Sequence, residues 1–411
     1  MSLVSETRKK SVEYVQDAIP NNPTDGQTWF DSINSEEMVY VGSMTAWKKL
    51  NELVGGDFLT PGELWTWGSN TDPAGQIGDL TTVNKSTPIQ IGSLNTWKQC
   101  NSGQYAALAL KTDGTLWSWN NNNFGSIGDN TIIAKSSPIQ VGLLTNWGLI
   151  SSRWGTVFNI KTDGKLWGWG TNANGELGDN TIIYKSSPIQ IGSLTTWKLV
   201  VTGYTSIYAI KTDGTLWAWG NNAGYYLGDG TSISKSSPIQ IGNLTTWKYI
   251  NSLKYGCSAI KLDGTLWAWG DNSNGLLGDG TTIIRSSPVQ IGNLTTWKSV
   301  TGGMSTLAIK TDGTLWGWGK NDNGELGDNT IILKSSPIQI GNLTTWKMCC
   351  KSTYFSSHGL KTDGTIWAWG SNDQGQFGDG TTISKSSPIQ VGNLTTWKSL
   401  SEGYRTTFAI R

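Results

Sequence analysis

Short apolar runs of strand length, separated by polar stretches rich in glycine, make up most of the chain. In residues 206–220, SIYAIKTDGTLWAWG, two apolar runs flank the pair Asp213-Gly214. Asp-Gly between apolar runs predicts a β-hairpin, because both central residues of its tight turn need a positive φ angle. The SSPIQ segments further on predict another strand with proline near its start, where a missing N–H donor is tolerated. No helical period runs through these segments, so the pattern indicates an all-β fold.

The same unit recurs about every fifty residues, and a tryptophan pair of the form LWxW marks each copy. The first tryptophan of each pair is Trp65, Trp117, Trp167, Trp217, Trp267, Trp316 or Trp367. A further tryptophan, in segments such as TTWK, keeps the same interval: Trp97, Trp147, Trp197, Trp247, Trp297, Trp346 and Trp397. A period near fifty is too long for helical repeats of about 34 residues and is typical of propeller blades.

Each copy offers about four strands: the apolar run before Asp-Gly, the LWxW run, a short threonine-rich run and the SSPIQ run. Seven copies therefore predict a seven-bladed β-propeller of four-stranded blades. A single blade cannot cover its own tryptophans, and stacking blades around an axis does so. Burial of one ring contributes at most on the order of 4–6 kcal/mol. We therefore expect the paired indoles to hold neighbouring blades together.

The ends of the repeat region predict how the ring closes. The last copy stops at Arg411, where other copies continue with T-D-G-T, and the first LWxW follows the segment TPGE, 60–63, in the register of that turn. We expect residues 397–411 to pair beside the strand that starts at Glu63, which completes one blade from both ends of the chain. Residues 47–59 are the alternative for this place, but they are shorter than the standard segment and break its alternation.

The repeated motif WGxNxxGxLGDGT followed by SSPxQI resembles the regulator of chromosome condensation repeat family, over about residues 60–411. The resemblance implies a seven-bladed propeller, and the founding member of the family is a nucleotide exchange factor that works on chromatin. The family usually carries a histidine in the pattern GxxHxxAL. The matching segments here read GQYAALAL, GYTSIYAI, GGMSTLAI and GYRTTFAI, and the only histidine, His358, lies in a divergent copy. The resemblance therefore implies the fold, and not exchange activity or chromatin binding.

The segment before the propeller, residues 1–59, predicts an anchoring unit with a short helix and a β-hairpin. Apolar positions over 3–19 fall on one helical stripe. Residues 20–47 resemble a short module of bacteriophage tail and fibre proteins, PxxPxxGxxWFD followed by VYxGxxW. The matched residues that are candidates for anchoring to a virion are Pro23, Gly26, Trp29, Phe30, Asp31, Tyr40 and Trp47. The resemblance implies a virion protein assembled in the host cytoplasm, and the alternative is a solvated extension packed on the propeller.

Composition narrows the partners that the chain could bind. The formal net charge is +1 and 15% of residues are charged, so the chain lacks the basic surface that nucleic-acid binding needs. No apolar run reaches the roughly 18 residues of a membrane span, and the N-terminus lacks the apolar core of a signal peptide. The four cysteines do not follow the repeat, which favours free thiols over a disulfide framework.

Candidate catalytic and metal-binding chemistry is sparse. A single histidine is a poor basis for nucleophile–base catalysis, and no phosphate-binding glycine loop ending in Gly-Lys-Ser/Thr is present. The aspartates of the LGD motif recur once per copy: Asp79, Asp129, Asp179, Asp229, Asp279, Asp328 and Asp379. One carboxylate per blade spreads around a ring instead of converging on calcium, so capping of a local turn is favoured. We expect no enzyme activity, no cofactor and no metal.

Repeated positions serve the scaffold, so we expect a site where the copies differ. The clearest divergence lies seven or eight residues after each TTWK-type tryptophan, at Tyr105, Trp154, Tyr204, Tyr255, Met304, Tyr354 and Tyr404. If the copies superpose, these side chains form a ring at one rim, and large rigid rings with scattered cations suit contact with a protein or a glycan. The alternative is packing between blades. Phe124, Tyr225 and Tyr226 form a second candidate surface.

Three functions are compatible with these patterns. The favoured one is a non-enzymatic virion structural protein, a tail fibre, adaptor or decoration that contacts other virion proteins through residues 1–59. The second is a receptor-binding adhesin whose rim grips a host-surface glycan or protein. The third is a cellular propeller scaffold or guanine nucleotide exchange factor. The oligomeric state is open, and a helix over 3–19 would suit a homo-oligomer.

Overall fold

The computed structural model describes residues 61–71, 75–352 and 355–411, together with the backbone of four strands near the N-terminus. The chain divides into two compact units, Met1–Leu59 and Thr60–Arg411, and each unit is described by itself.

The N-terminal unit contains a sheet with the strand order β1-β2-β3-β4. Its strands are β1 (Tyr14–Gln16), β2 (Thr28–Asp31), β3 (Glu36–Val41) and β4 (Ala46–Lys49). β1 runs parallel to β2, and the other neighbours are antiparallel. Within the helix expected over 3–19, Tyr14–Gln16 is extended and paired with β2, because one apolar stripe is weak support for a helix and tertiary pairing overrides it. The remainder of that helix lies outside the described residues.

The candidate anchoring residues are distributed over three of these strands. Trp29, Phe30 and Asp31 lie on β2, Tyr40 lies on β3 and Trp47 on β4, opposite Tyr40. Pro23 and Gly26 lie outside the described residues. The expected hairpin is present as β2 and β3, and the anchoring role of this segment stays a prediction.

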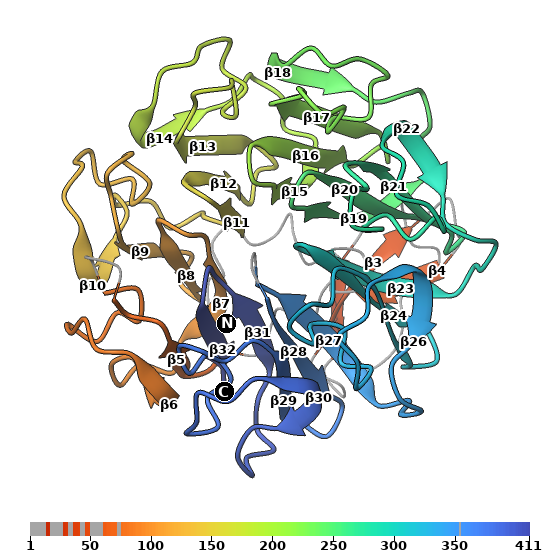
Figure 1. Cartoon of the computed structure of the whole chain (residues 1–411). Coiled ribbons are helices and arrows are strands. Elements are labelled where there is room, and N and C mark those ends of the chain that lie inside the picture. The colour runs from red at the N-terminus through yellow and green to blue at the C-terminus, as the bar shows by residue number, and fades with distance from the viewer. Residues whose placement is uncertain are drawn as a thin grey trace. The chain divides into compact units, whose positions relative to one another are not determined.

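The second unit consists of seven four-stranded antiparallel sheets arranged around a central axis as the blades of a propeller (Figure 1). The innermost strands are β7 (Trp97–Ser102), β11 (Leu149–Arg153), β15 (Trp197–Thr202), β19 (Trp247–Leu253), β23 (Trp297–Gly302), β27 (Trp346–Lys351) and β31 (Ser399–Glu402). The second strands are β8 (Ala107–Lys111), β12 (Thr156–Ile160), β16 (Ser206–Lys211), β20 (Gly256–Lys261), β24 (Ser305–Lys310), β28 (Ser356–Lys361) and β32 (Thr406–Ile410). The third strands are β5 (Leu64–Gly68), β9 (Leu116–Asn120), β13 (Leu166–Gly170), β17 (Leu216–Gly220), β21 (Leu266–Gly270), β25 (Leu315–Gly319) and β29 (Ile366–Gly370). The outer strands are β6 (Lys85–Gln90), β10 (Lys135–Gln140), β14 (Lys185–Gln190), β18 (Lys235–Gln240), β22 (Arg285–Gln290), β26 (Lys334–Gln339) and β30 (Lys385–Gln390). The predicted all-β, seven-bladed propeller is confirmed.

Hairpin turns form at the Asp-Gly pairs between the second and third strands of a blade, as predicted, but only the glycine has the positive φ that was expected of both residues. In the turn between β16 and β17, Gly214 has a φ of +77°, and Asp213 Oδ1 accepts a hydrogen bond from the backbone N–H of Thr215 at 2.9 Å. The threonine-rich run after LGD was expected to be a strand, and this expectation is wrong. Thr231 donates its backbone N–H and its hydroxyl to Asp229 Oδ1, both at 2.9 Å, so the chain turns there instead of pairing with a neighbour. The fourth strand of each blade is instead the innermost one, which lies at or just after the TTWK segment.

The ring closes in the predicted way, through strands from both ends of the repeat region. The closing blade has the order β31-β32-β5-β6. β32 and β5 are antiparallel in a register that runs from Thr406 opposite Gly68 to Ile410 opposite Leu64. Two backbone hydrogen bonds extend this pairing, from Glu63 N to Arg411 O at 3.0 Å and from Arg411 N to Glu63 O at 3.1 Å. The C-terminal strands, and not residues 47–59, therefore complete this blade.

The second tryptophan of each LWxW pair joins neighbouring blades. These rings are the largest fully buried side chains: Trp67, Trp119, Trp169, Trp219, Trp269, Trp318 and Trp369. Six of them donate the indole N–H to a backbone carbonyl of the preceding blade, as Trp119 does to Gln76 O at 2.9 Å. The exception is Trp269, whose indole N–H has no acceptor, while the hydroxyl of Tyr208 donates to the corresponding carbonyl, that of Tyr226, at 2.7 Å.

The first tryptophan of each pair is only half-buried, but each one packs against a buried cluster that two neighbouring blades share, as the paired indoles were expected to do. Each ring also carries a cation above it. Lys211 Nζ lies 3.4 Å from the ring centroid of Trp217 and 5.0 Å from that of Trp197. The same arrangement recurs at Lys111, Lys161, Lys261, Lys310 and Lys361. A lysine stem covers only part of an indole, which leaves the ring half-exposed.

Candidate binding face

Two sets of loops share one face of the propeller. Successive strands of a blade are antiparallel, so the loops after the innermost strand and after the third strand lie on one face, and the Asp-Gly turns lie on the other. Four of the candidate rim residues meet on the first of these faces. Ring centroids are 5.1 Å apart for Tyr105 and Trp154, 4.4 Å for Trp154 and Tyr204, and 5.7 Å for Tyr204 and Tyr255.

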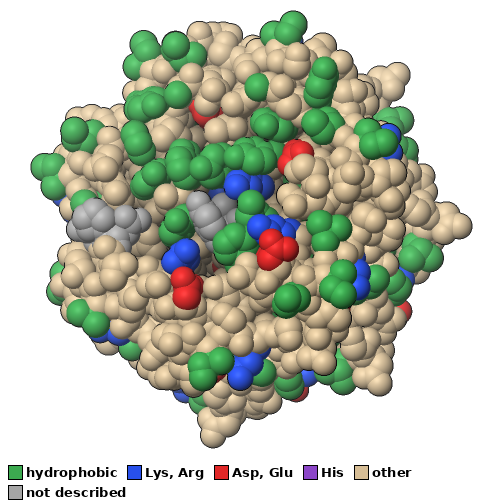
Figure 2. All heavy atoms as spheres, in the orientation of Figure 1, with side chains coloured by type: hydrophobic (Ala, Val, Ile, Leu, Met, Phe, Trp, Pro, Cys, Tyr) green, Lys and Arg blue, Asp and Glu red, His purple; other side chains and the backbone are tan. Residues whose placement is uncertain are grey.

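The row of rings continues outward at both ends. Phe124 meets Tyr105 edge to face at 5.2 Å, and Tyr184 meets Phe124 at 5.7 Å. At the other end Tyr226 stacks on Tyr255 at 5.2 Å and an interplanar angle of 21°. We call these seven rings the aromatic band: Tyr184, Phe124, Tyr105, Trp154, Tyr204, Tyr255 and Tyr226. Figure 2 shows hydrophobic side chains gathered in such a band beside the centre of this face.

Two aromatic residues on this face have unusual backbone conformations. Trp154, in the turn between β11 and β12, has a φ of +54°, and Tyr225, beside the band, has a φ of +63°. The other six repeats have glycine at the place of Tyr225: Gly75, Gly125, Gly175, Gly275, Gly324 and Gly375. At Gly175 an added Cβ would lie 2.6 Å from the Cα of Ser236 in the next blade. A side chain at position 225 is therefore disfavoured both by the positive φ and by crowding against the next blade. Tyr225 is 37% exposed.

Cations surround the inner part of the band. Lys254 Nζ lies 5.8 Å from the ring centroid of Tyr204 and 5.1 Å from that of Tyr255. Arg153, from β11, reaches two other blades and donates to the backbone carbonyls of Ser252 and Gly302 at 3.2 Å. Burial lowers the pKa of Arg153 to about 10, so the guanidinium stays charged at neutral pH. Burial, and then repulsion from neighbouring tyrosines, raises the pKa of Tyr204 to about 12, so its phenol stays protonated.

The remaining candidate rim residues are Met304, Tyr354 and Tyr404. Met304 is half-buried and its backbone carbonyl accepts from Lys320 N at 3.3 Å. Tyr404 lies under the guanidinium of Arg405, whose Cζ is 5.7 Å from the ring centroid. Tyr354 lies outside the described residues. Tyr105, Trp154, Tyr204 and Tyr255 therefore form a contiguous row, and the binding role of the candidate rim stays a prediction.

Three members of the band were not placed there by the repeat pattern. Phe124 and Tyr226 were assigned to a separate surface, and the structure shows that this surface is continuous with the rim. Tyr184 was missed. Its signal was available, because the matching position of the next copy is Ser234, so an aromatic residue at 184 is as divergent as one at the rim.

The ionisable residues away from this face make contacts within the fold. His358 is buried on β28, with its Nδ1 2.5 Å from Glu402 Oε1, and Ser356 donates its hydroxyl to the same oxygen at 3.0 Å. All four cysteines are free, as predicted. In the part of the chain that the structure describes, no three or more His, Cys, Asp or Glu side chains are grouped to hold a metal ion. Within that same part, no helix has the length and apolar character to cross a membrane.

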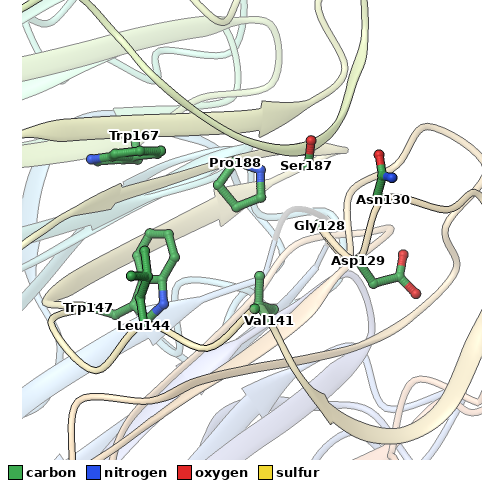
Figure 3. Close-up of a pocket in the computed structure, with 10 residues that line it drawn as sticks. Gly128, Asp129, Asn130, Val141, Leu144, Trp147, Trp167, Ser187 and Pro188 are labelled. Carbon is green, nitrogen blue, oxygen red and sulfur yellow. The ribbon is translucent and has the colours of Figure 1, made fainter.

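A cavity of about 310 Å³ lies between two blades, with Trp167 on one wall, Trp147 and Leu144 on the other, and Pro188 beside them (Figure 3). Most of its lining residues stand at positions that the other blades share, so the cavity belongs to the repeated scaffold. One feature is particular to it. The indole N–H of Trp167 has no acceptor, because Lys165 replaces the threonine whose hydroxyl accepts the equivalent N–H elsewhere.

Comparison with known sequences places the repeat in a family. The model of the regulator of chromosome condensation (RCC1) repeat matches six segments, which together span more than half of the chain: 61–110, 163–210, 213–252, 263–309, 312–356 and 363–410. The copy with no match, between 110 and 163, contains Arg153 and Trp154. A search of curated proteins finds no match to this sequence.

Solved structures of similar shape are propellers with low sequence identity. Human WBSCR16 is 16% identical, with a TM-score of 0.75 over 85% of this chain and 98% of that one. Yeast RCC1 (Prp20), solved bound to Kap60, is 19% identical, with a TM-score of 0.76 over 87% of this chain and 91% of that one. Prp20p from Saccharomyces cerevisiae, described with its binding to Gsp1p and histones, gives 19% identity and a TM-score of 0.74 over 88% and 95% of the two chains. At these identities the likeness shows the fold alone. The chain belongs to the regulator of chromosome condensation repeat family.

Proposed function

We propose that this chain is a non-enzymatic interaction propeller that binds a partner protein through its aromatic band. The observation that carries the proposal is the unbroken contact of seven rings across neighbouring blades, at positions where the repeats differ. Clusters of tyrosine and tryptophan with nearby arginine are typical of the energetic centres of protein interfaces. The strained backbone at Trp154 and Tyr225 supports selection of these side chains for something other than folding.

The solved relatives supply a precedent for a protein partner. Yeast Prp20 was solved bound to Kap60, and Prp20p is described with binding to Gsp1p and histones. A family that uses the propeller to bind proteins makes the cellular scaffold a better proposal than the virion protein that the sequence first favoured. None of the comparisons supports a virion role or a host receptor, and both stay predictions that rest on residues 20–47 and the rim. Detection of the chain in purified virus particles would test the virion role.

Guanine nucleotide exchange is a second candidate function, and membership of the repeat family favours it. The absence of the GxxHxxAL histidine from the segments quoted above counts against it. A nucleotide-release assay with small GTPases tests this candidate, and we expect no acceleration of release by the full chain.

The interaction itself can be tested before a partner is known. A cell-surface library of random peptides is selected on the immobilised full chain and then on the double variant Trp154→Gly, Tyr204→Ala. Glycine is chosen at 154 because it tolerates the positive φ there. We expect peptides that bind the natural chain and lose at least about tenfold in affinity on the variant, as loss of central interface rings predicts. The control variant Ile331→Ala, Ile332→Ala removes two exposed side chains outside the band and should bind normally.

A further inference from the structure

The cations on the binding face differ in whether a carboxylate neutralises them. Lys320 forms an ion pair with Asp322 at 3.1 Å, and Arg405 forms one with Asp373 at 3.0 Å. Figure 2 shows Lys or Arg side chains next to Asp or Glu side chains around the centre of the face. Lys254 and Arg153 are different, because among residues 61–71, 75–352 and 355–411 neither forms an ion pair. Each directly precedes a ring of the band in sequence, Trp154 after Arg153 and Tyr255 after Lys254.

Arg153 is fixed by neutral groups and keeps its charge. Its guanidinium donates to Ser252 O at 3.2 Å, to Ser252 Oγ at 3.1 Å and to Gly302 O at 3.2 Å. An added Cβ on Gly303 would lie 3.4 Å from Arg153 Nη2, and Gly303 O accepts from Lys254 N at 2.9 Å. The backbone of Lys254 and the guanidinium of Arg153 therefore meet the same glycine, and the charge of Arg153 acts on the Lys254 ammonium, which lies beside the rings of Tyr204 and Tyr255.

The surroundings of Lys254 favour an added anion. Burial, and then repulsion from Lys320 and Arg153, lowers the pKa of Lys254, and Asp271 acts in the opposite direction. The carboxylate of Asp271 does not form an ion pair with Lys254, and it accepts instead from Ser273 N at 3.1 Å and Ser273 Oγ at 3.0 Å. A carboxylate from outside the chain would gain from both cations without displacing an existing ion pair.

Resting on the proposed function, we infer that the partner presents an acidic peptide segment, in which an apolar or aromatic side chain packs on the band and an adjacent Asp or Glu carboxylate binds Lys254 beside Arg153. The apolar anchor would meet Trp154 and Tyr204, and the carboxylate would lie over the gap between the blades of β19 and β23.

The geometry of the band favours a peptide over a glycan. A sugar ring stacks best on an open, flat aromatic face. Here Trp154 and Tyr204 already lie 4.4 Å apart at an interplanar angle of 44°, and Tyr105 meets Trp154 edge to face at 73°. The band is thus a corrugated surface, with notches between rings that suit branched or aromatic side chains of a protein.

The test uses the full chain and short synthetic peptides that share one aromatic anchor and differ only in its neighbours: Asp and Glu, Asn and Gln, or Lys and Arg. We expect the acidic set to bind most tightly and its affinity to fall as salt rises. Lys254→Met should weaken acidic peptides by about tenfold or more, as loss of a charged hydrogen bond predicts. Lys254→Arg keeps the charge and should stay within about threefold of the natural chain.

Lys320→Met is the matched control, because Lys320 also lies over a ring, that of Phe355 at 5.0 Å, but is neutralised by Asp322. We expect it to change affinity by less than about threefold. Equal binding of acidic and amide peptides, with Lys254→Met unchanged, overturns the inference, while loss on Trp154→Gly, Tyr204→Ala would leave the proposed function standing. No binding of any peptide set to the natural chain contradicts the proposed function itself. Binding of sulfated or carboxylated glycans, with no peptide bound, overturns the assignment to a peptide.

Discussion

At the residue scale, aromatic side chains in this chain serve two purposes that their backbone and hydrogen bonds distinguish. Trp219 is fully buried and donates its indole N–H to Glu176 O at 2.7 Å, so its polar atom is satisfied inside the propeller. Trp154 and Tyr225 sit on the face with positive φ angles that L-residues adopt at a cost. A residue kept at such a cost at a repeat position that otherwise holds glycine indicates a role outside folding.

The positive φ of Tyr225 predicts that Tyr225→Gly stabilises the fold. Glycine adopts a φ of +63° without strain, so we expect a gain of about 1 kcal/mol in the free energy of unfolding, measured by urea denaturation. The control is Gly175→Ala at the equivalent place, where φ is +78° and Cβ would crowd Ser236, so this variant should lose stability. A loss of stability in Tyr225→Gly comparable to that of the control would show that the ring supports the fold.

At the element scale, one seam between blades differs from the others. Most neighbouring blades meet through apolar rings, as Phe158 and Trp219 do at 5.7 Å. Between β28 and β31 the buried pair of His358 and Glu402 lies beside an apolar cluster that includes Leu360 and Leu400, and the exposed fractions of the two polar side chains are 0% and 1%. His358 Nε2 and Glu402 Oε2 have no hydrogen-bond partner. Charged groups buried in this way add little to stability over apolar residues, although loss of one partner is costly.

A double-mutant cycle tests this account of the seam. Glu402→Ser places the serine of Ser102 and Ser152 at this position, and His358→Leu places the leucine of Leu108. We expect Glu402→Ser alone to destabilise by roughly 3–5 kcal/mol, because the histidine is left without its partner. The double variant should return to within about 1 kcal/mol of the natural chain or exceed it. Additive losses in the two single variants would contradict this account.

Lys351, whose ammonium donates to Ser357 Oγ and Glu325 O, gives the fold a pH dependence. Burial lowers its pKa to about 8 from the usual 10.5, and the charges of Glu325 and Glu402 oppose this shift. Between pH 8 and 10.5 the unfolded chain binds a proton that the folded chain has lost, so this group adds stability as pH rises through that window. Below pH 8 the folded chain bears the full cost of keeping Lys351 charged in its buried position, and this cost is on the order of 3 kcal/mol.

Unfolding in guanidinium between pH 7 and 10 measures this contribution as the difference between the natural chain and Lys351→Met. The contributions of other titratable groups cancel in that difference. The free energy of unfolding of the natural chain should therefore rise relative to that of the variant as pH rises. Parallel stability curves for the two chains would show that Lys351 does not titrate in the folded state as its burial requires.

At the scale of the whole molecule, the period of the repeat and its interrupted last copy were sufficient to predict seven blades and their closure. The number of blades follows from the number of copies. Closure follows because the strands that the first copy lacks must come from the C-terminal end of the repeat region. The threonine-rich run was misassigned because hydrogen bonds from Thr231 to Asp229 decide its shape, and these depend on a turn that periodicity does not reveal. The aromatic band was predicted only in part, because its continuity depends on contacts between blades, such as that of Tyr184 with Phe124.

Closure predicts that a chain without residues 397–411 loses the ring. β5 would lack its inner neighbours β32 and β31, and Trp67 would lose the cover of Leu400 and Ala409, with which it shares a core cluster. We expect a red shift of tryptophan emission and a larger hydrodynamic radius by size-exclusion chromatography. Removal of residues 1–59 is the control and should produce neither a red shift nor a larger radius. A truncated chain that keeps the emission and radius of the natural one would refute closure by the C-terminal strands.

The most direct measurement of the central claim is a hydrogen–deuterium exchange footprint of a selected peptide on the full chain. The account predicts protection in the loops that carry the band, at residues 103–106, 153–156, 203–206 and 253–256, with none in the Asp-Gly turns of the opposite face. Protection confined to the Asp-Gly turns, or a footprint that persists on Trp154→Gly, Tyr204→Ala, would contradict it.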